Sequence, residues 1–139
     1  MFNRKLQIGI VGDSEDPLLL ESAGVACARR GAVILVENSP FGELVVTGAA
    51  RIATMRHLSF SYPKSGGHLE FRANSTSKIS AIEALCNSSD GLVILGDAPL
   101  VEEIARSIKL PISKPGTPDA CLPEISDLIN RIVAESIRQ

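Results

Sequence analysis

Short unbroken runs of hydrophobic residues alternate along the chain with segments in which hydrophobic residues recur every three or four positions. Runs bounded by Gly, Pro or polar residues are typical of buried parallel strands. The runs of this kind are Leu6–Val11, Ala32–Val36, Gly91–Gly96 and the shorter Pro111–Ser113. A different pattern, alternation with period two, predicts a half-exposed strand at a sheet edge over His57–Tyr62, and His68–Arg72 is a candidate for one more short strand.

Helices are predicted in the segments between these strands. Hydrophobic residues at helical spacing predict them over residues 17–30, 43–55, 76–87, 101–108 and 123–137. The second is ambiguous because Leu44–Thr47 is also compatible with a strand, and helical spacing from Val45 to Met55 favours the helix. Pro17 and Pro123 suit the first turns of their helices.

Strands that alternate with helices predict an α/β fold. We expect a three-layer, Rossmann-like, doubly wound parallel sheet that forms one domain over residues 1–139. With His68–Arg72 left out, the five strands numbered along the chain should lie in the order 3-2-1-4-5. Ligands bind such sheets where the winding direction reverses, beyond the carboxyl ends of the strands. The loops at this point are Gly12–Ser14 and Gly96–Pro99.

Composition and charge exclude some classes of function. The 139 residues hold 14 Lys and Arg against 16 Asp and Glu, and only 4% are aromatic, which disfavours nucleic-acid binding. No secretory leader and no hydrophobic run of membrane-spanning length is recognisable, so we expect a cytoplasmic protein without a membrane partner. Cys27, Cys86 and Cys121 are far apart and should be reduced and buried.

Motifs for the common catalytic and cofactor sites are absent. The sequence has neither G-x-x-x-x-G-K-[ST] nor G-x-G-x-x-G, and its two histidines, His57 and His68, predict neither a catalytic triad nor a metal site. We therefore predict no cofactor and no metal. Asp13 and Asp97 stand in the two switch-point loops, where each could accept a hydrogen bond from a ligand hydroxyl or amine, or cap the helix that follows it.

Several segments resemble the SLOG superfamily, in particular the LOG-like proteins once mislabelled as lysine decarboxylases and their short single-domain branch. The segments are Ile8–Gly12, Ala28–Val33, Gly42–Glu43 with Gly48–Ala49, Asn87–Ile94, Gly96–Ala105 and Lys109–Ile112. The resemblance, together with the switch point, implies a ligand site formed by Gly12, Asp13, Ser14, Gly42, Gly96, Asp97 and Ala98. It also implies a homodimer formed through helices 43–55 and 76–87.

The chain departs from the active members of that family, which hydrolyse the N-glycosidic bond of cytokinin nucleotides. Ala81 and Ile82 stand where the family has an Arg-Lys pair, and Asp97, Pro99 and Leu100 replace residues of its Gly-rich phosphate loop. Gly96 remains, and its lack of a side chain would let backbone N–H groups approach a ligand. The strand-two turn is likewise Asn38–Pro40 instead of three glycines.

These departures favour a diverged, non-catalytic domain that binds a nucleotide-like or other small ligand as a sensor or carrier. Molybdenum-cofactor carrier proteins resemble the same family and show that the fold can bind without turnover. Two alternatives stay open. One is a nucleotide N-glycoside hydrolase with a rearranged site that uses Glu43 and Glu103, and the other is a structural subunit that binds a partner.

Overall fold

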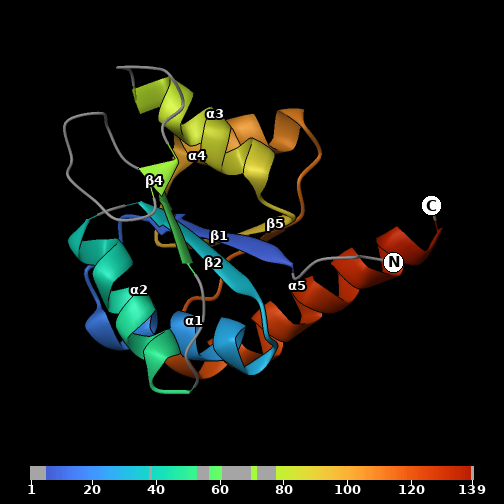
Figure 1. The fold of residues 1–139 in the computed structure, drawn as a ribbon. Coiled ribbons are helices and arrows are strands. Elements are labelled where there is room, and N and C mark those ends of the chain that lie inside the picture. Colours follow the sequence, from blue (N-terminus) through green and yellow to red (C-terminus); the bar gives the residue numbers. More distant parts are fainter. Residues whose placement is uncertain (1–5, 38, 53–56, 61–69, 72–77, 139) are drawn as a thin grey trace.

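The computed structural model describes residues 6–37, 39–52, 57–60, 70–71 and 78–138 (Figure 1). Its strands form one six-stranded sheet in the order β4-β3-β2-β1-β5-β6, and every neighbouring pair is parallel. The strands are β1 (Gln7–Gly12), β2 (Val33–Glu37), β3 (His57–Phe60), β4 (Glu70–Phe71), β5 (Gly91–Leu95) and β6 (Ile112–Ser113). The α/β fold and the predicted order of the five strands are confirmed.

One strand prediction is wrong. We expected an edge position for His57–Tyr62, but β3 pairs with β2 on one side and with β4 on the other, where Ser59 lies opposite Glu70. A period-two pattern indicates that one face of a strand is polar. It carries no information on whether the backbone edge of that strand has a hydrogen-bonded neighbour. Residues 61–69 of the predicted strand and loop lie outside the described residues.

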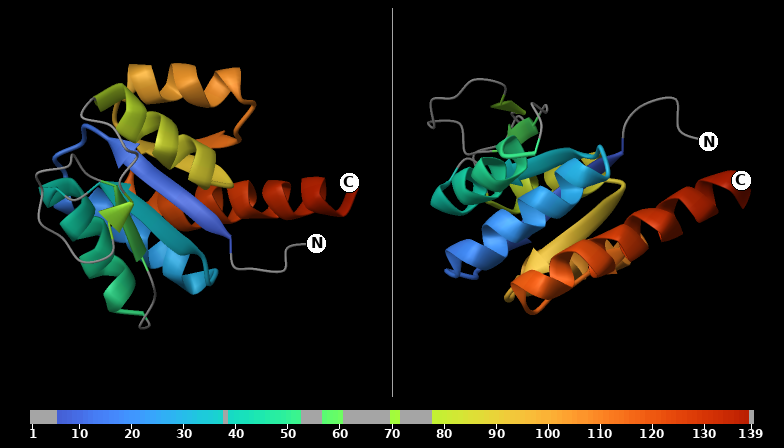
Figure 2. Two further views of the ribbon diagram at one scale, coloured as in Figure 1. Left: turned by 45° about the horizontal axis from the view of Figure 1, so that its top comes forward. Right: turned by 90° about the horizontal axis from the view of Figure 1, so that it is seen from below.

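Helices cover both faces of the sheet, as expected (Figures 1 and 2). They are α1 (Pro17–Arg29), α2 (Pro40–Ala50), α3 (Lys78–Ser88), α4 (Pro99–Ser107) and α5 (Pro118–Arg138). One hydrophobic core lies between the sheet and α1, α2 and α5, and a smaller one lies between the sheet and α3 and α4. None of the helices in the described part of the chain combines the length and the hydrophobicity needed to cross a membrane.

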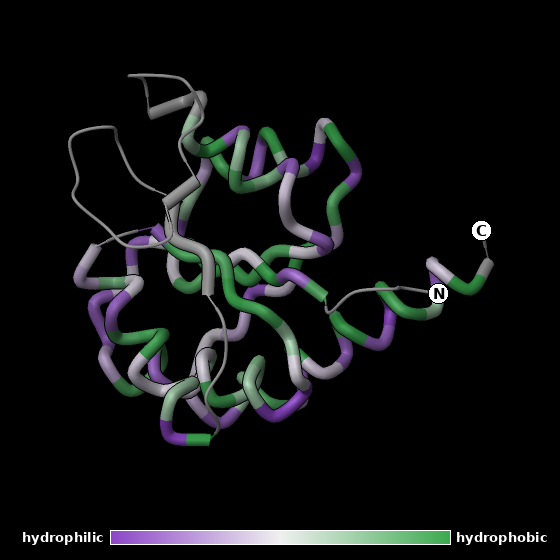
Figure 3. The backbone as a smooth tube through the Cα atoms, viewed as in Figure 1, coloured by the Kyte–Doolittle hydropathy of each residue, from purple (hydrophilic) through white to green (hydrophobic). Residues whose placement is uncertain are grey.

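Three helices begin earlier than predicted: α4 at Pro99 instead of residue 101, and α2 and α5 by larger margins. Helix α2 starts at Pro40 because Ser39 is its N-cap, with Ser39 Oγ accepting the Gly42 N–H at 3.2 Å. Helix α5 starts at Pro118, and Pro123 lies inside it instead of opening it. Hydrophobic and hydrophilic residues alternate along α5 (Figure 3), and its buried side chains pack on the core despite the backbone hydrogen bond that Pro123 cannot donate.

The strands that carry the site are buried. Every residue of β5 is buried, as are the central residues of β1 and β2, which confirms the reading of their hydrophobic runs. Cys27, Cys86 and Cys121 are free and buried, as expected. Burial raises the pKa of the Cys27 thiol to about 12. The sheet therefore offers a rigid edge from which loops can position a site.

Candidate functional site

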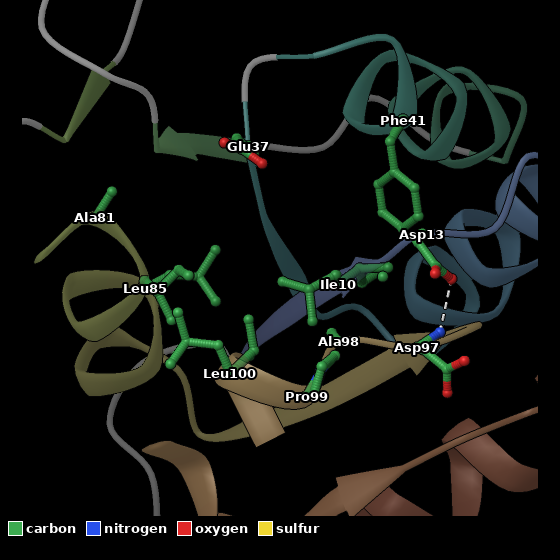
Figure 4. Close-up of a pocket in the computed structure, with 14 residues that line it drawn as sticks. Ile10, Asp13, Glu37, Phe41, Ala81, Leu85, Asp97, Ala98, Pro99 and Leu100 are labelled. Carbon is green, nitrogen blue, oxygen red and sulfur yellow. Dashed lines mark hydrogen bonds between the residues drawn. The ribbon is translucent and has the colours of Figure 1, made fainter. Parts of the chain in front are cut away.

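The loops that follow β1 and β5 are held together by hydrogen bonds. The Asp13 carboxylate accepts from the Asp97 backbone N–H, with 2.7 Å between Oδ1 and N (Figure 4). In the same place the Ser14 N–H donates to the Leu95 carbonyl at 3.1 Å. Because β1 and β5 run parallel and stay paired up to Gly12, both loops leave the sheet at one edge. The two segments that the switch-point argument selected therefore lie side by side.

Two glycines permit this close approach. A Cβ on Gly12 would lie 2.0 Å from the Leu95 carbonyl oxygen, and a Cβ on Gly96 would lie 2.3 Å from Asp13 Oδ1. Gly96 also has a φ of +87°, which side chains rarely adopt. We expected the space beside Gly96 to admit a ligand, but the Asp13 carboxylate occupies it.

Neither aspartate caps the helix that follows it. Asp16 is the N-cap of α1, where its Oδ1 accepts the Leu18 N–H at 3.1 Å. Ala98 occupies the N-cap of α4, and within the described residues no side chain caps that helix. Asp13 instead binds the loop that leads into α4. The capping interpretation of both aspartates is thus wrong, because Asp13 binds the distant Asp97 N–H and because α4 has its N-cap at Ala98, one residue after Asp97.

A cavity of about 420 Å³ lies beside these loops. The lining is largely apolar and comes from four regions: Ile10 and Val11 of β1, Phe41 of α2, the α3 face around Leu85, and the start of α4 (Figure 4). Three acidic residues complete it, namely Asp13, Glu37 and Asp97. In Figure 4 the Asp97 carboxylate points away from Ile10 and from the centre of the cavity.

The structure brings some of the predicted ligand-binding residues to this cavity. Gly12, Asp13, Asp97 and Ala98 line it. Ser14 and Gly96 belong to the same loops without lining it. Gly42 is buried in the first turn of α2, where a Cβ would lie 2.1 Å from the Glu37 carbonyl oxygen. Because Gly42 has no side chain, α2 can pack against the end of β2.

The two glutamates considered for catalysis are elsewhere. Glu43 on α2 and Glu103 on α4 are exposed and do not line the cavity. The next residue on α4, Glu102, is held by Arg106, whose Nη2 lies 2.6 Å from Glu102 Oε2, and by Lys114. Hydrogen bonds from Lys114 and Arg106 lower the pKa of Glu102. This cluster ties α4 to the segment after β6.

Ala81 and Ile82 of α3 do line the cavity. These are the positions at which the resemblance would place an Arg-Lys pair, so two hydrocarbon side chains line the cavity there. Within the described residues, no group of three His, Cys, Asp or Glu could hold a metal ion. His68 lies outside those residues, and the predicted metal-free site stays a prediction.

Sequence reasoning missed Glu37, Phe41 and Leu85. Glu37 ends β2, the neighbour of β1, and Phe41 lies in the helix turn that follows. The sequence could have indicated Glu37 and Phe41, because they lie at or just after the carboxyl end of the strand next to the switch point and these strand ends share one edge of the sheet. For Leu85 no local signal exists, because helical spacing alone does not distinguish a cavity wall from a packed core.

No model of a known protein family and no curated protein matches the sequence. Several solved structures match the fold. The molybdenum cofactor carrier protein from Chlamydomonas reinhardtii is 16% identical, with a TM-score of 0.75 over 94% of this chain and 99% of that one. The molybdenum cofactor binding protein from Rippkaea orientalis is 17% identical, with a TM-score of 0.62 over 92% and 99%.

The chain has the fold of these cofactor carrier proteins. A third solved structure, the structural-genomics target TM1055, is 14% identical with a TM-score of 0.64 and covers 77% of this chain and 72% of its own. The carrier proteins match along nearly their whole length. The Rossmann-like architecture expected from the resemblance is therefore confirmed, and the role of the cavity has to be argued from its own residues.

Proposed function

We propose that this domain is a non-catalytic carrier or sensor that binds one small molecule in the cavity at the carboxyl ends of β1 and β5. The observation that carries the proposal is the cavity itself. It has about 420 Å³, a size suited to a small organic ligand, and it lies at the switch point where such sheets bind ligands. The fold shared with molybdenum cofactor carriers supports binding without turnover.

The composition of the lining supports binding over hydrolysis. The alternative hydrolase with a rearranged site would use Glu43 and Glu103, and neither residue lines the cavity. The side chains of Ala81 and Ile82 can neither hold a phosphate nor stabilise a developing charge. We expect no release of base from AMP or CMP. Turnover that Glu103→Ala abolishes would instead establish a rearranged hydrolase.

The proposal includes three finer points. We propose a nucleotide-like ligand, a homodimeric assembly and a cytoplasmic location. The ligand and the assembly are implied by the family resemblance, and the location is an expectation from the sequence. The alternative of a partner-binding subunit would be favoured by a domain whose cavity holds nothing.

The first test is to identify what the protein carries. The native protein should be purified without denaturing steps, and its bound compounds released by acid and identified by mass spectrometry, with molybdenum measured in parallel. We expect a stoichiometric small molecule. Ala81→Phe, which fills the cavity from α3, should lose it, whereas Ala134→Phe on the exposed surface of α5 should keep it. A folded Ala81→Phe variant with a full load of ligand would refute the site.

A further inference from the structure

The charges carried by the described lining of the cavity are all negative. Asp13 and Glu37 lie at separate points of its edge, and Asp97 is the third acidic residue of the lining, with its carboxylate pointing away from the centre of the cavity (Figure 4). Asp13 uses Oδ1 to hold the Asp97 N–H, and its second oxygen, Oδ2, takes no part in that bond. Carboxylates accept hydrogen bonds and donate none when ionised. The acidic edge therefore suits ligand groups that carry N–H or O–H donors.

The start of α4 supplies the opposite polarity. Leu100 and Val101 line the cavity, and backbone N–H groups in the first turn have no acceptor within their helix. Pro99 has no N–H, and within the described residues no side chain caps the helix. This end of the cavity can donate to an acceptor atom of a ligand.

A phosphate is a poor occupant of that position. The start of a helix carries about half a unit of positive charge. A phosphate placed there would lie next to the loop that holds the negative charges of Asp13 and Asp97, and their repulsion opposes the attraction of the helix start. A neutral carbonyl oxygen would accept from the same N–H groups without that repulsion.

The walls between the two polar ends are hydrocarbon and one aromatic ring. Phe41 faces the cavity from α2, and Leu85 and Ala81 line the opposite side from α3 (Figure 4). Two apolar walls of this kind favour a flat ring system, because a ring buries both of its faces and can stack on Phe41.

We infer that the cavity takes a planar heterocycle that is uncharged or cationic and carries no phosphate. It accepts hydrogen bonds from the start of α4 and donates them to Glu37 and Asp13. The inference rests on the proposed function and defines its ligand more narrowly: the base or nucleoside part of a nucleotide is bound, and a phosphate group weakens its binding.

Matched pairs of probes test this by calorimetry. Adenosine and cytidine should bind, and AMP and CMP should bind about tenfold more weakly because of charge repulsion. Added salt should narrow the gap, since it screens the carboxylates. Glu37→Gln and Asp97→Asn should also narrow it, whereas Glu103→Gln, on α4 but outside the lining, should leave the ratio unchanged.

The outcomes separate this inference from the proposed function. Monophosphates that bind as tightly as their nucleosides, or a phosphorylated compound released from the native protein, would overturn the inference and leave the carrier role intact. If no probe binds and no compound is released, both fail. A nucleoside preference that Glu37→Gln and Asp97→Asn leave unchanged would also overturn it, because the carboxylates would not be its cause.

Discussion

Asp13 accepts a hydrogen bond from the backbone N–H of Asp97, a residue 84 positions away in the sequence, and so fastens the β1 loop to the loop that opens α4. The contact sits at the edge of the cavity, and both residues line it. The geometry of the candidate site therefore depends on a bond between two loops.

Removing this bond should destabilise the protein moderately. Asp13→Ala leaves the Asp97 N–H without its acceptor, and we expect the free energy of unfolding to fall by about 1 kcal/mol, the usual net contribution of an intramolecular hydrogen bond. Asp13→Asn retains a side-chain oxygen and should lose less. Urea denaturation measures both. Equal stability of Asp13→Ala and the parent would show that the loops are held by other contacts.

Gly96 and Gly31 offer a matched pair for testing how tightly the loops pack. Both have a positive φ, +87° and +71°, but a Cβ on Gly31 would meet nothing within 4 Å, whereas one on Gly96 would meet Asp13 Oδ1 at 2.3 Å. Gly31→Ala should lower the free energy of unfolding by about 1 kcal/mol, because alanine disfavours the positive φ. Gly96→Ala should lower it clearly more, as measured by thermal or urea unfolding. Similar losses for the two would mean that Asp13 moves aside freely.

The fold was largely predictable from the sequence because its signals are local. The hydrophobic runs that become β1, β2 and β5 are buried on both faces of the sheet, and such runs with helices between them leave few topologies. The errors lie where local signals conflict or end. Pro123 marks a helix start in most contexts and here lies inside α5, and the edge of β3 is occupied by the short β4.

The site was predictable only in part, for a related reason. The switch-point rule depends on strand order, and it selected loops that do meet, including Asp13 and Asp97. The roles of individual residues depend on distant contacts. Gly96 makes room for Asp13, Gly42 makes room for β2, and neither relationship is visible in the segment around the glycine.

Low pH should lower the stability of the folded protein, in part through protonation of Glu102. Its pKa lies below the ordinary value of 4.5 because of Lys114 and Arg106, so the unfolded chain takes up the proton first as the pH falls. The stability that these contacts contribute is present above that ordinary value and is lost as the pH drops through the lower folded pKa. Glu102→Gln should flatten this loss in urea titrations at falling pH, whereas Glu103→Gln at the exposed neighbouring position should follow the parent.

The cysteines should be unreactive in the folded protein. Burial raises the pKa of Cys27 to about 12 and those of Cys86 and Cys121 to about 11, so almost no thiolate forms near neutral pH. A thiol-specific reagent should modify none of these thiols in the native state within the time that it modifies all of them in urea. Rapid native labelling, located by peptide mapping, would contradict the burial of the residue that reacts.

Finally, the proposed homodimer can be tested through one exposed side chain at its expected interface. Helices α2 and α3 correspond to the segments for which an interface is proposed, and Ile52, just after α2, is 40% exposed. Light scattering should give twice the mass of the chain, and Ile52→Lys should shift it toward the monomer, because a charge would be buried at the interface. Ile137→Lys is the control: it is 67% exposed near the end of α5, away from the proposed interface, and should leave the mass unchanged. A monomer mass for the parent at every concentration would exclude the dimer, and dissociation by Ile137→Lys instead would move the interface to α5.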